Sequence, residues 1–336
     1  MEWPKRFYLL FVLVVCFCLY CSLAVFAEDV VESYTFLPGE KVIKVEDFSS
    51  GQLPKDVFFF DGRTEFVKED GDTWLKAVKT YLRVALPQKL EDLTFDFYFK
   101  AQNYPGMEIT FGRPYDASVR VGRQDEYVYF SGSCAGKLLP YTYWYKKKCY
   151  NDDETVHFSM TINQQKLKIY INRVLVLNAA GFVPKMPEEI RFYFGDNVKN
   201  SQMLIKDLRL ATHVPDIAGE LLKKGKYSSH GIYFDTGSAK LNAEYYHVLK
   251  QIAEVLLNNP EIKLLIVGHT DNVGGKELNQ RLSLDRAGSV KNFLVTNYNI
   301  DPERLSIDGK GDTEPVADNG TPEGRAQNRR VEFIRR

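Results

Sequence analysis

Two oppositely charged residues near the C-terminus, Asp271 and Arg286, have the chemistry and the spacing of a binding site. An apolar run at 262–267 stops at a glycine and leads into a short polar loop that holds Asp271, and Arg286 follows 15 residues later in a helical pattern. A carboxylate is a partner for an ammonium group, and the planar guanidinium of arginine binds a carboxylate through two hydrogen bonds. A strand, a loop and a helix would present both groups at one rim, where they would grip a zwitterion.

On residue types alone, a simpler interpretation is a salt bridge that fixes the loop to the helix. Such a bridge would be weak, because exposed ion pairs contribute only about 0–1 kcal/mol. The five histidines lack metal-site spacing, and no carboxylates follow the pattern of a jelly-roll glycosidase. We therefore predict no catalytic residue, metal or cofactor, and the motifs described below decide between the salt bridge and a ligand site.

The sequence around the pair alternates between short strands and helices. Strands are predicted at 231–234, 262–267, 304–307 and 331–334, and helices at 242–258, at 276–296 and from Pro322 after an N-cap at Thr321. The apolar residues predicted to face inward from the second helix are Leu278, Leu282, Val290, Phe293 and Leu294. This pattern predicts an α+β two-layer domain, in which two helices cover one face of a small mixed sheet.

Five ordered motifs carry a resemblance to a known family. They are IYFDTGSAKL at 232–241, GHTDNVG at 268–274, NQRLSLDRA at 279–287, GKGDTEPVADN at 309–319 and GRAQNRRVEF at 324–333. Together they resemble the OmpA-like peptidoglycan-binding domain, which MotB-type stator proteins and peptidoglycan-associated lipoproteins share. The resemblance covers about a third of the chain, from roughly residue 217 to the end, and it favours the ligand site over the salt bridge.

The resemblance implies a ligand and a role for individual residues. The ligand is diaminopimelate, a component of Gram-negative-type peptidoglycan that carries an ammonium and a carboxylate at its side-chain end. The family's ammonium contact falls on Asp271 and its carboxylate contact on Arg286. The further matching positions, which line the pocket or lie close to it, are Thr270, Asn279, Leu282 and Arg329.

The chain from about Glu40 to Leu210 is β-like, with short β-branched and aromatic runs between Gly, Pro, Asn and Asp clusters. The opening VEDFSSGQLP at 45–54 and the paired runs 158–162 and 168–173 resemble concanavalin-like and laminin-G-like jelly rolls, with Arg173 where glycine is usual. We predict an all-β, jelly roll-like sandwich with a glycan or an envelope protein as its partner. The alternatives are an outer-membrane barrel with a wall-binding tail and a carbohydrate-active enzyme with a wall-anchoring module. Acidic turns at 69–72 and 151–154 are weak candidates for calcium.

The first residues indicate export. Lys5 and Arg6 precede an uncharged run at 7–27 that ends in small residues, which predicts a signal peptide cut after Ala27, with an uncleaved anchor as the alternative. In an exported chain, Cys134 and Cys149 are candidates for a disulfide, against two free thiols. The net charge of zero gives no basis for a nucleic-acid partner.

These observations predict four segments. They are a signal peptide at 1–27, a β-sandwich domain at 28–212, a linker with a short helix at 213–229 and an OmpA-like peptidoglycan-binding domain at 230–336. The predicted protein is a non-enzymatic component of the cell envelope, in the periplasm and associated with the outer membrane and the cell wall.

Overall fold

The computed structural model describes residues 36–87, 90–102, 107–112, 117–124, 127–134, 137–138, 143–145, 153–163, 166–179, 186–194, 202–230, 232, 234, 237–241 and 246–336. The predicted signal peptide and Cys149 of the predicted disulfide lie outside these residues, so both stay predictions. Within the described part, no helix is both long and apolar enough to cross a membrane.

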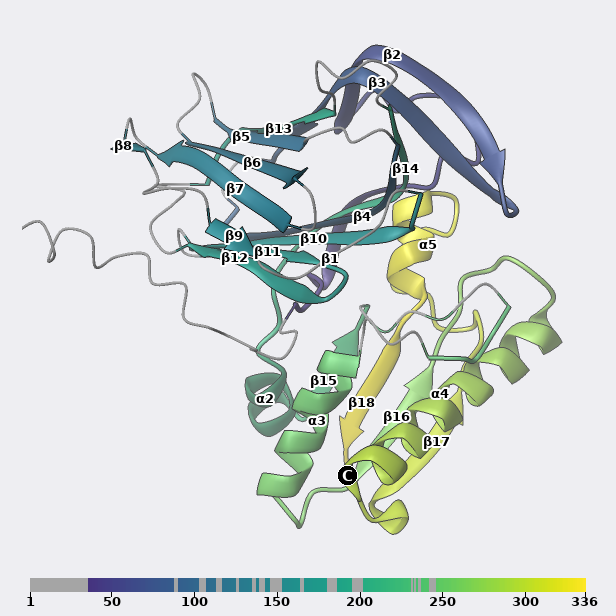
Figure 1. Cartoon of the computed structure of the whole chain (residues 1–336). Helices are drawn as coiled ribbons and strands as arrows, with labels where there is room; N and C mark the ends of the chain where they lie inside the picture. Colours follow the sequence, from purple (N-terminus) through teal and green to yellow (C-terminus); the bar gives the residue numbers. More distant parts are fainter. Residues whose placement is uncertain are drawn as a thin grey trace, which may run out of the picture.

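The chain up to residue 212 forms one large antiparallel sheet, which confirms that this half is built from strands (Figure 1). The first seven strands are β1 (Lys41–Glu46), β2 (Phe58–Glu69), β3 (Asp72–Ala85), β4 (Asp92–Gln102), β5 (Met107–Phe111), β6 (Ala117–Gln124) and β7 (Tyr127–Cys134). The next seven are β8 (Lys137–Leu138), β9 (Tyr143–Tyr145), β10 (Val156–Asn163), β11 (Lys166–Ile171), β12 (Val174–Ala179), β13 (Glu189–Phe194) and β14 (Gln202–Thr212). The predicted pairing of 158–162 with 168–173 is confirmed as far as Ile171, which lies opposite Phe158, whereas Asn172 and Arg173 form the turn that follows.

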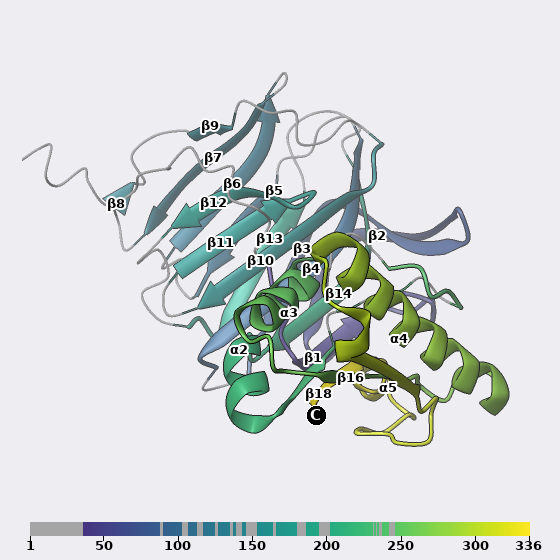
Figure 2. The same cartoon turned by 90° about the horizontal axis from the view of Figure 1, so that it is seen from below.

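This sheet bends over its aromatic face. The strand order places β14 and β3 between β4 and β13, which would separate β4 and β13 by roughly 14 Å in a flat sheet at about 4.8 Å per strand. Instead, the ring of Phe192 in β13 lies 5.0 Å from Phe95 in β4 and 6.0 Å from Phe158 in β10, measured between centroids. Strands β5, β6 and β7 therefore face β10, β11 and β12 across a buried aromatic core (Figures 1 and 2). The jelly-roll type of this β part stays a prediction.

The acidic turn at 69–72 is balanced by lysines. Glu69 pairs with Lys100 and Asp72 pairs with Lys206, and both lysines also lie over the ring of Trp74. Among the described residues, no group of three or more His, Cys, Asp or Glu side chains is placed to hold a metal ion. The carboxylates of Glu69 and Asp72 therefore form ion pairs with lysines of the neighbouring strands.

The C-terminal part is a four-stranded mixed sheet with helices, as predicted. Its elements are α2 (Ile217–Gly219), a π-helical turn (Glu220–Lys224), β15 (Lys226–Ser229), α3 (Tyr246–Asn258), β16 (Leu264–Gly268), α4 (Lys276–Tyr298), a 3-10 turn (Pro302–Arg304), β17 (Leu305–Gly309), α5 (Pro322–Asn328) and β18 (Val331–Arg335). The strand order is β15-β18-β16-β17, and only the β16–β17 pair is parallel. Helices α3 and α4 lie on one face of this sheet (Figure 1).

The first strand of this part is β15 at Lys226–Ser229, which was not among the predicted strands. Of the predicted strand at 231–234 the structure describes residues 232 and 234, and Phe234 forms an isolated bridge with Leu241, so that strand stays a prediction. One detail of the prediction was wrong. Leu278 was predicted to face inward, yet it is 62% exposed. The reason is length: α4 has 23 residues, or about 35 Å at about 1.5 Å per residue, whereas the five-residue strands span about 17 Å. The first turn of α4 therefore extends beyond the sheet, and Val290 and Leu294 make the predicted core contacts further along.

Glycines at the ends of the two parallel strands allow α4 to approach the sheet closely. A Cβ atom on Gly268 would lie 2.0 Å from the backbone oxygen of Ser283, and one on Gly309 would lie 2.5 Å from the backbone nitrogen of Leu284. The hydroxyl of Ser283 also accepts a hydrogen bond from the backbone of Gly311 at 2.9 Å. Backbone contacts therefore determine where the middle of α4, which carries Arg286, lies relative to the strand ends.

The segment at 36–46 forms a junction between the two parts. The ring of Phe36 packs edge-on against Tyr170 of β11, whereas Leu37 belongs to the hydrophobic core of the C-terminal part. Further along, the ammonium group of Lys44 in β1 lies 3.0 Å from a carboxylate oxygen of Glu323 in α5. The junction therefore links the large sheet both to the C-terminal core and to helix α5.

Candidate ligand-binding site

The loop after β16 holds Asp271 in a defined, mostly buried position. The backbone nitrogen of Thr270 donates to Gly311 at 2.9 Å, and the side-chain amide of Asn279 donates to the backbone oxygen of Asp271 at 3.2 Å. One carboxylate oxygen of Asp271 accepts a hydrogen bond from the backbone of Val273 at 3.0 Å. Both Thr270 and Asn279 are buried. They shape the loop that presents the carboxylate.

Arg286 projects from α4 into the same region and is largely buried. Its Nε atom donates to the backbone oxygen of Ser238 at 3.0 Å, and its guanidinium lies 4.9 Å from the centre of the Phe234 ring. Burial lowers the pKa of Arg286 to about 10; the positive charge of Arg329 lowers it further and Asp271 opposes the shift. The guanidinium remains charged at neutral pH, held by the segment that carries the first of the five sequence motifs.

Arg329 completes the cluster from the end of α5. It is the C-cap residue of this short helix, where its backbone nitrogen still bonds to the oxygen of Arg325. Its Nη1 atom lies 2.6 Å from the second carboxylate oxygen of Asp271. The structure therefore brings Asp271, Arg286 and Arg329 together, and the acid is already paired with the second arginine.

A small pocket opens beside this cluster. Its lining residues are His230, Ile232, Phe234, His269, Arg286, Arg329, Arg330 and Val331. Three arginines contribute to the lining, and none of the described lining residues is acidic, so the pocket suits an anionic group. Of the predicted site residues, Arg286 and Arg329 line it. Thr270, Asp271 and Asn279 form the adjoining loop, and Leu282 lies half-buried one turn before Arg286.

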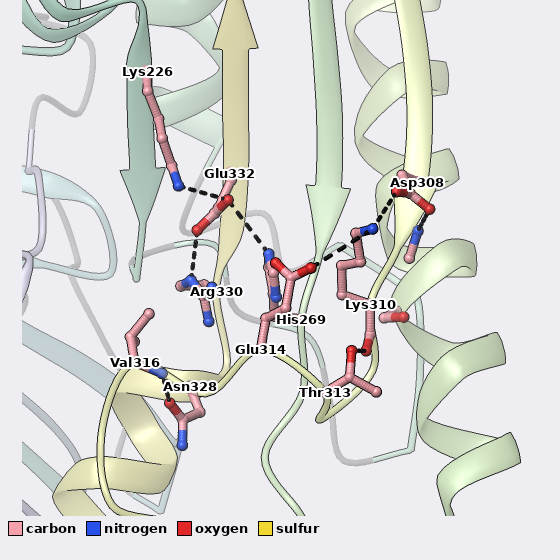
Figure 3. Close-up of polar contacts among 12 residues, drawn as sticks. Lys226, His269, Asp308, Lys310, Thr313, Glu314, Val316, Asn328, Arg330 and Glu332 are labelled. Carbon is pink, nitrogen blue, oxygen red and sulfur yellow. Dashed lines mark hydrogen bonds and ion pairs between the residues drawn. The ribbon is translucent and has the colours of Figure 1, made fainter.

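A second charge cluster, which was not predicted from the sequence, lies in the sheet next to the pocket (Figure 3). The carboxylate of Glu332 in β18 lies 2.8 Å from the ammonium of Lys226, 2.9 Å from Nε of Arg330 and 3.5 Å from the ring of His269. Burial alone would raise the pKa of Glu332, but the contacts from His269, Lys226 and Arg330 outweigh it and hold the pKa below its usual range. A glutamate inside the apolar run of the last predicted strand was the sequence signal for this cluster.

Asn328 has a structural role that its motif does not reveal. Its buried side chain accepts a hydrogen bond from the backbone of Val316 at 2.8 Å (Figure 3). It also accepts one from the backbone of Ala317 at 3.0 Å and donates to Ala317 and Asn319. Asn319 in turn accepts from the backbone of Asn272, next to Asp271. Asn328 therefore ties the loop before α5 to the loop that carries the acid, one residue before Arg329.

Comparisons with known proteins match the part of the chain that contains these residues. The model of the OmpA family matches residues 233–329. The chain is 48% identical over 100 residues to outer membrane protein Omp38 of Acinetobacter baumannii, covering 30% of this chain and 28% of that protein. It is 38% identical over 103 residues to the peptidoglycan-binding protein ArfA of Mycobacterium bovis, covering 31% of each chain.

A solved structure of the peptidoglycan-associated lipoprotein from Burkholderia pseudomallei is 30% identical, with a TM-score of 0.30, and the match covers 32% of this chain and 89% of that one. The chain thus spans less than a third of the length of Omp38 and of ArfA. Each of these three matches covers about a third of this chain. Residues 233–329, with the cluster of Asp271, Arg286 and Arg329, therefore form an OmpA family domain.

Proposed function

We propose that the protein is a non-catalytic component of the cell envelope that binds diaminopimelate-containing peptidoglycan without a covalent bond. The observation that carries the proposal is that Asp271 and Arg286, an acid and a base from different elements, lie close enough to interact electrostatically. They lie beside a pocket that is lined by arginines. The match to the OmpA family supports the proposal, as does the relative that is named a peptidoglycan-binding protein.

Each residue of the site has a role in this proposal. The carboxylate of Asp271 receives the ammonium of the ligand, and the guanidinium of Arg286 receives its carboxylate, with the planar geometry that favours two parallel hydrogen bonds. Thr270 and Asn279 hold the loop, Leu282 provides apolar contact, and Arg329 borders the site. A polymer that repeats the ligand tolerates a weak single site, because neighbouring copies raise the effective concentration.

A pull-down with purified sacculi tests this proposal. The wild-type chain should sediment with sacculi, whereas Asp271→Ala and Arg286→Ala should each lower the bound fraction at least about tenfold, since each leaves a charge of the ligand unpaired. Arg281→Gln is the matched control, because this arginine lies on α4 with 84% of its side chain exposed. Equal retention of the two site variants and the control would rule out the assigned site.

The part before the OmpA family domain adds a second proposed contact. We place a β-sandwich domain at 28–212 and a linker at 213–229, with the sandwich displayed in the periplasm by the wall-binding domain. The bent sheet with its buried aromatic core supports a jelly roll-like domain whose partner is a glycan or an envelope protein. A glycan array probed with the full chain and with its Asp271→Ala variant distinguishes binding by the sandwich from binding by the C-terminal site. Signals that the variant keeps belong to the sandwich. N-terminal sequencing of the mature protein tests the cut after Ala27.

A further inference from the structure

The acid of the site is already occupied before any ligand arrives. Both oxygens of the Asp271 carboxylate are engaged, one by the backbone of Val273 at 3.0 Å and the other by Arg329 at 2.6 Å. The Asp271 side chain is 12% exposed, so little of it faces water, whereas that of Arg329 is 41% exposed. An incoming ammonium group therefore competes with the guanidinium of Arg329 for this carboxylate.

The displaced guanidinium stays beside a second positive charge. Arg286 and Arg329 line the same pocket, and the charge of Arg329 already disfavours the charged form of Arg286. The next residue, Arg330, pairs with Glu332 through its Nε atom at 2.9 Å. Because Arg330 is itself positively charged, it cannot offset the charge of Arg329. An Arg329 released from Asp271 loses that counter-charge beside a second positive charge, and an anionic group in the pocket would replace it.

The backbone around Arg329 is held in place, so the side chain can exchange partners while the chain path stays fixed. Asn328 forms four hydrogen bonds to the loop at 316–319, and Glu323 at the start of α5 is bound by Lys44. The guanidinium of Arg329, 41% exposed, therefore extends from a fixed backbone and lies between Asp271 and the pocket.

We propose that Arg329 determines specificity, by competing for Asp271 so that the site selects zwitterions over simple amines. This inference rests on the proposed function and deepens it. A diaminopimelate side chain supplies an ammonium to Asp271 and a carboxylate to Arg286, and that carboxylate also offers an anionic partner to the freed Arg329 in the same pocket. A lysine side chain supplies only the ammonium and leaves Arg329 unpaired next to Arg286. Selectivity here comes from an unpaired charge imposed on the wrong ligand.

Calorimetric titration of the full chain with two synthetic stem peptides tests the inference. The peptides differ only in carrying diaminopimelate or lysine at one position, so the sole chemical difference is one carboxylate. In Arg329→Gln the lysine peptide should bind about five- to tenfold more tightly than in the wild type, which corresponds to about 1–1.4 kcal/mol. The diaminopimelate peptide should gain nothing or lose affinity. Arg281→Gln should leave both affinities unchanged, and Arg329→Lys, which keeps the charge, should preserve selectivity.

The outcomes separate the two proposals. Lysine-peptide binding that is unchanged or weaker in Arg329→Gln, in a variant that melts like the wild type, overturns the competition by Arg329. Failure of the wild type to bind the diaminopimelate peptide, or equal binding by Asp271→Asn, overturns the proposed function itself and the inference with it.

Discussion

Two carboxylates with little exposure, Glu332 in the C-terminal sheet and Glu40 at the junction, have opposite surroundings. Glu332 lies among Lys226, Arg330 and His269, and these contacts lower its pKa despite the burial that raises it. Burial raises the pKa of Glu40 to about 7; the nearby Glu220 adds to this effect and Lys224 only partly offsets it. One oxygen of Glu40 is buried without a hydrogen-bond partner.

The two carboxylates have opposite effects on the stability of the fold as the pH changes. A carboxylate whose pKa is lowered by folding stabilises the fold above the pKa of the unfolded chain, about 4.3, and loses that contribution as the pH falls. A carboxylate whose pKa is raised by folding does the reverse, so Glu40 lowers stability as the pH rises from about 4.3 towards 7. The contacts of Glu332 therefore stabilise the sheet beside the candidate site at neutral pH, whereas the Glu40 carboxylate destabilises the junction at neutral pH and does so less in mild acid.

The largest effect is expected from Glu332→Gln, which removes the counter-charge of the network. Arg330 would be left buried and unpaired, and breaking a buried pair in this way costs about 3–5 kcal/mol, with a value near 3 expected here because Lys226 is half-exposed. Urea unfolding at pH 7 measures the loss. Glu254→Gln, on an exposed face of α3, is the matched control and should shift the midpoint little. A midpoint equal to that of the control would show that the network does not stabilise the sheet.

A smaller effect of opposite sign is expected from Glu40→Gln. The amide removes a carboxylate that is poorly paired and mostly buried, and its full pKa shift corresponds to roughly 3 kcal/mol. Because 19% of the side chain is exposed to screening solvent, we expect the variant to be more stable than the wild type by about 2 kcal/mol at pH 8. At pH 4 the wild-type carboxyl is protonated in the folded state and the difference should vanish. Thermal unfolding at the two pH values measures both, with the exposed Glu261→Gln as control. A stabilisation that is the same at pH 4 and pH 8 would contradict the assigned pKa shift.

The smallest effect is expected from Lys44→Met, which removes the ion pairs between β1 and both Asp56 and Glu323. Each pair lies at 3.0 Å, and the lysine side chain is 15% exposed, so we expect a loss of about 1 kcal/mol. Hydrogen exchange at the start of α5 should rise in this variant, because Glu323 would keep only a long 3.5 Å contact with the backbone of Val45 among its contacts to β1. Lys41→Met, exposed in the same strand, should leave both measurements unchanged. Unaltered exchange in α5 would mean that other contacts hold the junction.

The sequence predicted the parts of the site that depend on local pattern. Strand β16 followed by a glycine, and the apolar period of α4, place Asp271 and Arg286 near each other, as the structure has them. The pairing of Asp271 with Arg329 joins residues 58 positions apart, and the Glu332 network joins three strands whose order is not their order in the chain. The periodicity of a strand indicates which side chains share a face but not which strands are its neighbours, so these contacts could not be predicted. The exposure of Leu278 could not be predicted for a related reason, because the apolar period of the helix does not reveal where the sheet beneath it ends.

The two glycines at 268 and 309 have a consequence for how this domain can vary. Because α4 rests there on backbone atoms rather than on side chains, the distance from the strand ends to Arg286 does not depend on the sizes of the surrounding core residues. Core residues such as Val290 and Leu294 can change in volume at a cost in stability while the reach of Arg286 stays the same. The two glycines therefore fix the position of Arg286, while the core residues can be substituted more freely. The geometry around Arg286 can persist even when the core beneath it changes.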